Sequence, residues 1–254
     1  MSRIYPAISV VIPTCDRPES LLGAIESVMR QSMRPQEVIV VDNGSCRVDR
    51  SVLVDDVMVV KLSPYVGASR ARNAGVEAAS GDYVAFLDDD DTWDVDYLAH
   101  MREAIRDQGE PDMLIGRKDR MKDGSRYVYK CIEETEQLLK ELLVSNPGVG
   151  GQNTVVKREA FLEVGGYDSS LLTSEDRALA IDFLLNQAHV VSVPNAAAIM
   201  GDHEGVRLRR PRTMARGKLA FFQKYRHLMS QRMVVVSLCK ILMLYVRDLK
   251  RRVW

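Results

Sequence analysis

The chain has little cysteine and no long apolar run, and each absence removes a class of protein. Its four cysteines, Cys15, Cys46, Cys131 and Cys239, stand far apart without a CxxC pair. Neither a disulfide framework nor a zinc cage is therefore indicated. No stretch reaches the roughly 18 uninterrupted apolar residues of a membrane-spanning helix, and residues 1–7 hold no signal-peptide core. A reducing, cytoplasmic location is expected.

Internal repeats and low-complexity segments are also missing. Apolar residues make up 46% and charged residues 28% of the 254 residues, proportions that are ordinary for a folded globular protein and exclude a mostly disordered or collagen-like chain. This length suits one large or two small domains.

Net charge is zero, but the charge is unevenly distributed. Residues 205–254 contain fourteen Lys and Arg against one acid, Asp248, whereas residues 1–204 carry 21 basic and 34 acidic residues. An acidic body with a basic tail favours contact between the tail and an anionic surface such as phospholipid or a polyphosphate, although a merely solvated basic helix fits the same pattern.

Short apolar runs alternate with helical patterns in the first hundred residues. The runs cover residues 8–12, 38–41, 57–61 and 83–87, and apolar residues repeat every three or four positions between the first two, after Pro18. This rhythm predicts strands joined by helices and a mainly parallel sheet with helices on both faces. Ligands bind such sheets at the carboxyl ends of the strands.

Three of these predicted strands end in polar residues, at positions 13–16, 42–45 and 88–91. Because parallel strands end on the same edge of a sheet, we expect the three segments to converge in space. The second half of the chain is less regular. It predicts a strand near residues 127–131, a helix from about 134 to 144, a Gly-rich loop at 146–151, and helices from residue 211 to the end.

Four consecutive aspartates, residues 88–91, follow the apolar strand at 83–87. Adjacent carboxylates repel one another unless a cation or hydrogen-bond donors neutralise them, and hard oxygen ligands suit Mg²⁺ or Mn²⁺ together with substrate phosphates. Asp88 and Asp90 are the candidate ligands. Asp91 and Asp94 could instead cap a helix that starts near residue 94.

A helix is predicted to open at residues 67–75, where small residues accompany Arg70 and Arg72. Helix N-terminal amides and arginine both favour phosphate oxygens. Pairing of either arginine with surface acids is the alternative.

Taken together, residues 8–14, 40–45, 67–73 and 81–93 closely resemble the motifs of the family 2 glycosyltransferases of the GT-A fold, in the same order and at similar distances. The resemblance covers about residues 7–205. It implies an inverting, metal-dependent transfer of a sugar from a nucleotide-diphosphate sugar to an acceptor hydroxyl.

The resemblance also implies roles for donor-site residues. Thr14 and Asp42 would contact the nucleoside, with Asp42 accepting from the base, and Arg72 would lie near the base and the pyrophosphate. Asp88 and Asp90 match the DxD motif, in which the first Asp approaches the ribose or the metal and the second binds the metal.

Residues 164–168 and Ser174-Glu175-Asp176 resemble the segments that carry the family's catalytic base, which makes Asp176 the candidate base. Inversion needs a carboxylate on the acceptor side to remove the hydroxyl proton, which agrees with this role. Glu175 would cap the following helix or orient the acceptor.

Other positions match the family less directly. Cys15 occupies a position that is often aromatic in the family, so base stacking by that side chain is not expected. His203 lies where related enzymes often place a histidine over the diphosphate and metal. Gln152 and Asn153, in the segment before the base, could donate to acceptor hydroxyls.

The basic tail has two competing interpretations. Arginines gather around Pro211, and the nearly apolar stretch at 233–246 is followed by Arg247, Lys250, Arg251 and Arg252. Such a helix could lie in the headgroup plane of a membrane that carries a lipid-linked acceptor, or it could pack in a homodimer.

Two other functions fit parts of the sequence. Asp88, Asp90 and Thr92 also fit the nucleophile motif of haloacid-dehalogenase-like phosphotransferases, but three predicted strands precede the motif here and Gly201-Asp202 lacks the second acid of that family's metal pair. A non-catalytic nucleotide-sugar-binding scaffold is disfavoured because Asp88, Asp90 and Asp176 are all present.

The sequence therefore predicts an α/β protein of the GT-A type. Residues 1–205 would form the transferase domain, with a nucleotide-binding half to about residue 117 and an acceptor half from about 118, and residues 206–254 a basic helical extension. The expected reaction is transfer from a UDP-sugar, or next a dTDP-sugar, to a saccharide or lipid-linked acceptor in surface polysaccharide or glycolipid synthesis. Mn²⁺ or Mg²⁺ is the expected cofactor, the inner face of the membrane a possible site of action, and nucleic acid is not an expected partner.

Overall fold

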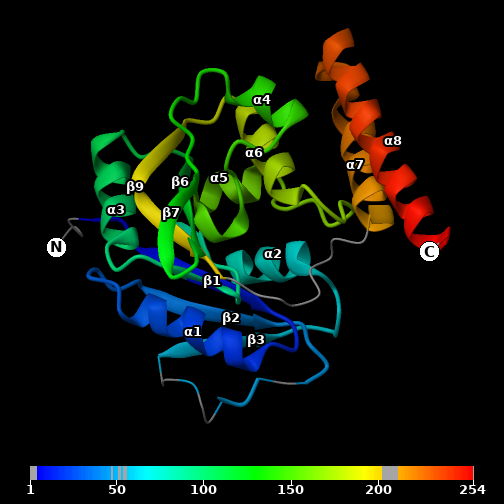
Figure 1. Ribbon diagram of the computed structural model, residues 1–254. Helices are drawn as coiled ribbons and strands as arrows, with labels where there is room; N and C mark the ends of the chain where they lie inside the picture. The colour runs from blue at the N-terminus through cyan, green and yellow to red at the C-terminus, as the bar shows by residue number, and fades with distance from the viewer. Residues whose placement is uncertain (1–4, 47, 51–52, 54–55, 202–210, 254) are drawn as a thin grey trace.

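The computed structural model describes residues 5–46, 48–50, 53, 56–201 and 211–253. Within them, nine strands form one mixed sheet with helices on both faces (Figure 1). In sheet order the strands are β3 (Val57–Lys61), β2 (Glu37–Asp42), β1 (Ile8–Thr14), β4 (Tyr83–Phe86), β8 (Thr154–Lys157), β6 (Met113–Lys122), β9 (Val190–Met200) and β5 (Asp91–Trp93), and β7 (Ser125–Lys130) pairs with β6.

The first half of the sheet is parallel, as the alternation of apolar runs and helical patterns predicted. β1 pairs in parallel with both β2 and β4, and β2 pairs in parallel with β3. Every residue of β1 is buried, because a central parallel strand is covered on both faces. Helix α1 (Pro18–Met29) begins at the expected proline, and α2 (Ala68–Ala78) begins after Gly67, whose φ of 93° favours glycine.

The second half is mixed. β8 runs antiparallel to β4 and β6, whereas β6 and β9 are parallel. The expected strand near 127–131 is confirmed as β7. The expected helix from about 134 begins later, as α4 (Leu138–Val144), and the strand β6 was not predicted because its lysines and arginines break the apolar run after Gly116.

The alternative role of Asp91 and Asp94 as helix caps is wrong. Asp91 lies in β5, paired with β9, and Asp94 accepts from Arg126 and from the backbone of Val95. The next helix, α3 (Tyr97–Asp107), begins three residues later, after Asp96.

Two apolar cores lie on opposite faces of the sheet. One contains residues of α1 and α3. The other contains residues of α2, α4, α5 (Arg158–Glu163), α6 (Glu175–Leu185) and α7 (Pro211–Tyr225). The sheet is thereby held from both sides, and its strand ends are fixed in position.

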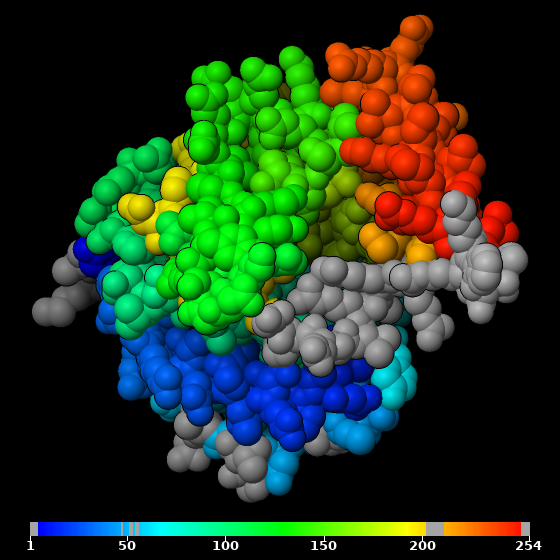
Figure 2. Space-filling view, viewed as in Figure 1, coloured from blue at the N-terminus to red at the C-terminus, as the bar shows by residue number. Residues whose placement is uncertain are grey.

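After α7, a short 3₁₀ turn, η3 (Arg226–Leu228), leads to the long helix α8 (Gln231–Val253). The space-filling view shows α7 and α8 at one side of the molecule, next to the part that holds α4 and apart from α1 (Figure 2). The expected helices after residue 211 are confirmed. None of the described helices is long and apolar enough to cross a membrane.

Candidate active site

The predicted convergence of polar strand ends is confirmed. A cleft of ≈ 460 Å³ lies over the carboxyl ends of β1, β2 and β4, and the first turn of α2 closes one side of it. Its lining residues are Pro13, Thr14, Cys15, Arg17, Asn43, Tyr65, Gly67, Ala68, Arg72, Asp88, Asp89 and Asp90.

The four aspartates divide into two pairs. Asp89 and Asp91 are buried and bonded to protein, since Asp89 accepts from Thr14 Oγ1 at 2.8 Å and Asp91 accepts from the Gly201 N–H at 2.9 Å. Burial and the neighbouring carboxylates raise the pKa of Asp91 to about 7. Asp88 and Asp90 keep 27% and 24% of their side-chain surface exposed and line the cleft. They are the two more exposed carboxylates of the cluster, and each is paired with an arginine, Asp88 with Arg72 and Asp90 with Arg17.

Arg17, which the sequence analysis missed, neutralises part of this acidic cluster. It precedes α1, and its Nη1 lies 3.0 Å from Asp89 Oδ1 and 3.1 Å from Asp90 Oδ2. Desolvation opposes its charge, but the aspartates outweigh that effect and raise its pKa. Its place just after the polar end of β1 was the available signal.

Arg72, on α2, connects the cleft to α6. Its Nη2 donates to Asp88 Oδ1 at 2.5 Å, and its Nη1 lies 3.6 Å from Glu175 Oε1 and 3.8 Å from Asp176 Oδ1. The guanidinium is buried over the ring of Tyr167, at 5.1 Å. This burial opposes the charge of Arg72, but Asp88 and the other acids outweigh it and raise its pKa.

Glycine at position 151 permits this arrangement. A Cβ there would stand 2.5 Å from Arg72 Nη2, so any larger residue would displace the guanidinium. Gly151 opens the 3₁₀ turn η2 (Gly151–Asn153), which brings the Gly-rich loop against α2.

Asp176 and Glu175 are the first two residues of α6, after Ser174 with a left-handed φ of 70°. The Oδ1 atom of Asp176 is buried and has no hydrogen-bond partner in the described structure. Burial, followed by the charge of Glu175, raises the pKa of Asp176 to about 7. A carboxylate with this pKa can accept a proton near neutral pH.

Lys118, also missed by the sequence analysis, is buried beside the same acids. It lies on β6, its Nζ donates to the Val149 carbonyl at 3.0 Å, and a Cβ on Gly150 would overlap it. Burial lowers the pKa of Lys118, while the charges of Asp176, Asp88 and Asp91 oppose that effect. No strand pattern is visible around residue 118, because charged residues follow Gly116, so the sequence could not place Lys118 in the site.

Thr14 and Asp42, the expected nucleoside contacts, are both engaged with protein. Thr14 lines the cleft but donates to Asp89, and Asp42 is fully buried and accepts from the N–H groups of Gly44 and Val48. The neighbour of Asp42, Asn43, reaches the cleft instead. Direct contacts of Thr14 and Asp42 with a nucleoside stay predictions.

Tyr65 supplies the aromatic ring that Cys15 does not. Both line the cleft, and the Tyr65 side chain is 66% exposed, with its hydroxyl 2.9 Å from Asp16 Oδ2 and from Ser45 Oγ. Its φ of 61° is uncommon for a non-glycine residue and is held by the surrounding loop. The position follows β3 rather than β1, so the family's sequence pattern could not reveal it.

Gln152 and Asn153, the expected acceptor contacts, are buried in the second half of the sheet. Asn153 Nδ2 donates to the Gly116 and Gly148 carbonyls, and the Gln152 carbonyl accepts from Trp93 Nε1. Asn153 therefore fixes the loop, and acceptor contacts by either side chain stay predictions. His203 lies outside the described residues.

The cleft supplies some, but not all, of the ligands that a divalent cation needs. No group of three or more His, Cys, Asp or Glu among the described residues is arranged to hold a metal. Two cleft-facing carboxylates, Asp88 and Asp90, match the one or two that Mg²⁺ usually takes when substrate phosphates complete its coordination. The site therefore fits a cation that binds together with a phosphorylated donor.

Two curated glycosyltransferases are similar to this chain in sequence. A glycosyltransferase of Haemophilus influenzae without assigned function is 28% identical over 184 residues, which cover 70% of this chain and 60% of that protein. The putative teichuronic acid biosynthesis glycosyltransferase TuaG of Bacillus subtilis is 31% identical over 165 residues, which cover 63% of this chain and 65% of TuaG. The chain thus spans less than two thirds of these relatives.

The crystal structure of S. aureus TarS residues 1–349 with UDP-GlcNAc superposes with a TM-score of 0.67 at 20% identity, over 86% of this chain and 66% of that one. This likeness confirms the expected GT-A fold. The family model described as glycosyl transferase family 2 matches residues 9–165, more than half of the chain. The protein therefore belongs to glycosyl transferase family 2.

Proposed function

We propose that the protein transfers a sugar, with inversion, from a nucleotide-diphosphate sugar to an acceptor hydroxyl. One observation carries the proposal: Arg72 joins Asp88, on the donor cleft, to Asp176, whose buried oxygen has no hydrogen-bond partner. The two carboxylates are thereby held at fixed positions with separate environments. Inversion requires this separation of leaving-group stabilisation from proton removal.

On the donor side, the diphosphate would lie in the cleft between the first turn of α2 and Asp88 and Asp90. The N–H groups at the start of α2 favour phosphate oxygens, and Gly67 lets the chain approach closely. Asp88 and Asp90 would hold Mg²⁺ or Mn²⁺, which supplies positive charge to the leaving diphosphate when bound.

On the acceptor side, Asp176 would take the proton of the attacking hydroxyl as the oxygen bonds to the anomeric carbon. The bond from that carbon to the diphosphate breaks on the opposite side, and the product anomer is inverted. Arg72 and Lys118 would keep enough positive charge near Asp176 for its carboxylate form to exist at neutral pH. Glu175, 21% exposed at the start of α6, would contact the acceptor.

The exposed ring of Tyr65 would stack on the base, with Asn43 beside it. The TarS complex with UDP-GlcNAc supports a UDP-sugar as the first candidate, with a dTDP-sugar next.

Surface polysaccharide or glycolipid synthesis is the proposed role. The names of two relatives support it: TuaG is putatively assigned to teichuronic acid biosynthesis, and AmsB of Erwinia amylovora, 28% identical over 190 residues, to amylovoran biosynthesis.

The first experiment is a thermal-shift screen of UDP, dTDP and GDP, each with and without Mn²⁺. A nucleotide that binds only the folded protein raises its melting temperature in proportion to the logarithm of its concentration. We expect the largest shift with UDP and Mn²⁺. Equal melting temperatures with and without every nucleotide would contradict the proposed donor class.

A further inference from the structure

Helix α8 carries a stripe of exposed apolar side chains along one face. Its members are separated by three or four residues, which places them on one side of a helix over about 21 Å. They are Val235 (59% exposed), Leu238 (46%), Leu242 (63%), Val246 (42%) and Leu249 (62%), and Met243 (55%) lies beside them. Isolated exposed leucines are common, whereas a periodic stripe marks a binding face.

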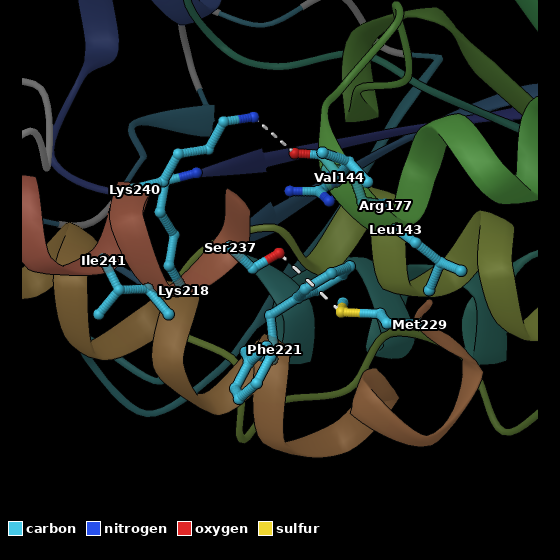
Figure 3. A pocket seen from close by; sticks show the side chains of 10 residues that line it. Leu143, Val144, Arg177, Lys218, Phe221, Met229, Ser237, Lys240 and Ile241 are labelled. Carbon is cyan, nitrogen blue, oxygen red and sulfur yellow. Dashed lines mark hydrogen bonds between the residues drawn. The ribbon is translucent and has the colours of Figure 1, made fainter. Parts of the chain in front are cut away.

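The other face of α8 is anchored to the protein. Ile241 is buried, Lys240 Nζ donates to the Val144 carbonyl of α4 at 2.9 Å, and Ser237 Oγ donates to Met229 Sδ (Figure 3). The helix is thus fixed in rotation, and the stripe points away from α4 and α7. The stripe is therefore not the face of α8 that packs against the core of the protein.

A basic groove adjoins the stripe. It has a volume of ≈ 190 Å³ and is lined by Lys218, Lys240, Met243, Leu244 and Arg247, so that Met243 belongs to both features. In the described part of the chain no carboxylate forms an ion pair with Lys218 or Lys240.

A fourth cation lies behind the groove, in addition to Lys218, Lys240 and Arg247. Arg177, on α6, is 6% exposed, donates to the Leu142 carbonyl and lines a small cavity together with Lys218 and Lys240. Burial, together with the charges of Arg177 and Lys240, lowers the pKa of Lys218. Four cations held this close favour an anion in the groove.

An apolar stripe can be covered by a second copy of the protein or by a lipid layer, and the charge of this region distinguishes the two. Residues 211–253 carry eleven Lys and Arg against one acid, Asp248. A second copy packed stripe to stripe would bring two such positive surfaces together, which is unfavourable. A layer of anionic phospholipid accepts both features, since acyl chains cover apolar side chains and headgroup phosphates pair with the lysines and arginines.

We propose that α7 and α8 dock the protein on an anionic phospholipid surface, with the α8 stripe inserted at the level of the headgroups and a lipid phosphate in the groove of Lys218, Lys240 and Arg247. The donor cleft lies elsewhere, over the ends of β1, β2 and β4. Docking is therefore separable from the transfer reaction and is tested without it.

The test is flotation of the full-length protein with vesicles of phosphatidylcholine alone or mixed with phosphatidylglycerol. We expect binding to the mixed vesicles at low salt, release as salt is raised, and little binding to phosphatidylcholine alone. Lys218→Gln with Arg247→Gln should weaken binding by about fivefold for each charge removed. Leu242→Ser with Val246→Ser should weaken it at every salt concentration, because apolar insertion is not screened.

Control variants each carry one change of the same kind elsewhere. Arg30→Gln removes an exposed charge directly after α1, and Met58→Ser alters an exposed apolar side chain on β3. Both should bind vesicles as the unaltered protein does, and all variants should melt within a few degrees of it. These melting curves separate loss of docking from loss of folding.

Three results would overturn the proposal. The full-length protein could ignore phosphatidylglycerol vesicles at low salt. Both double variants could bind as strongly as the controls. Light scattering without lipid could show a dimer that Leu242→Ser with Val246→Ser converts to a monomer, which would make the stripe a subunit interface.

Discussion

Replacing Asp176 by asparagine keeps the shape of the side chain and removes the proposed base. General base catalysis contributes roughly 10²–10⁴-fold, so turnover should fall by that factor. Affinity for the donor nucleotide should not change, because the cleft is lined from β1, β2, β4 and α2 and not by Asp176. Initial rates of sugar transfer and calorimetric titration with UDP and Mn²⁺ measure the two quantities separately.

The same substitution should change how stability depends on pH. The pKa of Asp176 is raised to about 7, above its value in an unfolded chain, so the folded protein retains a proton that the unfolded chain releases. The stabilisation is complete at low pH and is lost as pH rises toward 7. At about 1.4 kcal/mol for each unit of pKa difference, the contribution cannot exceed about 4 kcal/mol.

Asparagine does not titrate, so the variant does not lose this stabilisation as pH rises. The free energy of unfolding of the variant minus that of the unaltered protein should therefore increase from pH 5 to pH 8. Urea unfolding at the two pH values, followed by tryptophan fluorescence, measures this gain. The activity of the unaltered protein should rise as pH passes through about 7, as the base loses its proton. Unchanged turnover in the variant, or an equal stability difference at both pH values, would refute the reasoning.

Three further substitutions test other parts of the site. Asp90→Ala should abolish transfer while urea unfolding of the metal-free protein shows equal or greater stability, since one charge of the acidic cluster is gone; full activity in EDTA would contradict the metal assignment. Tyr65→Ala should weaken UDP binding by about 1–3 kcal/mol in calorimetry, whereas Tyr65→Phe should retain it, because stacking needs only the ring. Gly151→Ala should displace Arg72. It should lower the free energy of unfolding, measured with urea, by about 1–3 kcal/mol, and it should also lower the transfer activity. Its control, Gly23→Ala, meets no atom within 4 Å on α1 and should stabilise the protein slightly.

The amino-acid sequence by itself determined the first half of the fold. β1, β2 and β4 are short apolar runs bounded by polar residues, and local pattern is sufficient for strands that are buried on both faces. The same kind of run marks β3, which lies partly exposed at the edge of the sheet. The sequence also determined that the polar strand ends meet, because that follows from parallel connectivity alone. The acidic segment 88–91 was identifiable because four adjacent carboxylates after a strand call for a neutralising cation or hydrogen-bond donors before any folding is known. Asp176 was identifiable only from the resemblance to family 2 glycosyltransferases.

Only the tertiary structure decided which of these residues work together. β6 has a mixed sequence and becomes a strand because β8 and β9 flank it, and that pairing carries Lys118 to the acids of the site. The division of the four aspartates into a buried pair and a more exposed pair depends on Thr14 and on Gly201, which are distant in the chain. Their partners could not be inferred from spacing.

Helix α8 shows the same difference between what the sequence determines and what only the tertiary structure determines. Its composition predicted a basic helix with an apolar run, but an apolar run does not say which residues face inward. The contacts of Ile241 and Lys240 with the rest of the protein fix the rotation of the helix, and that rotation leaves the stripe from Val235 to Leu249 outside. Composition is a property of the chain, whereas the exposure of a face depends on what packs against its opposite side.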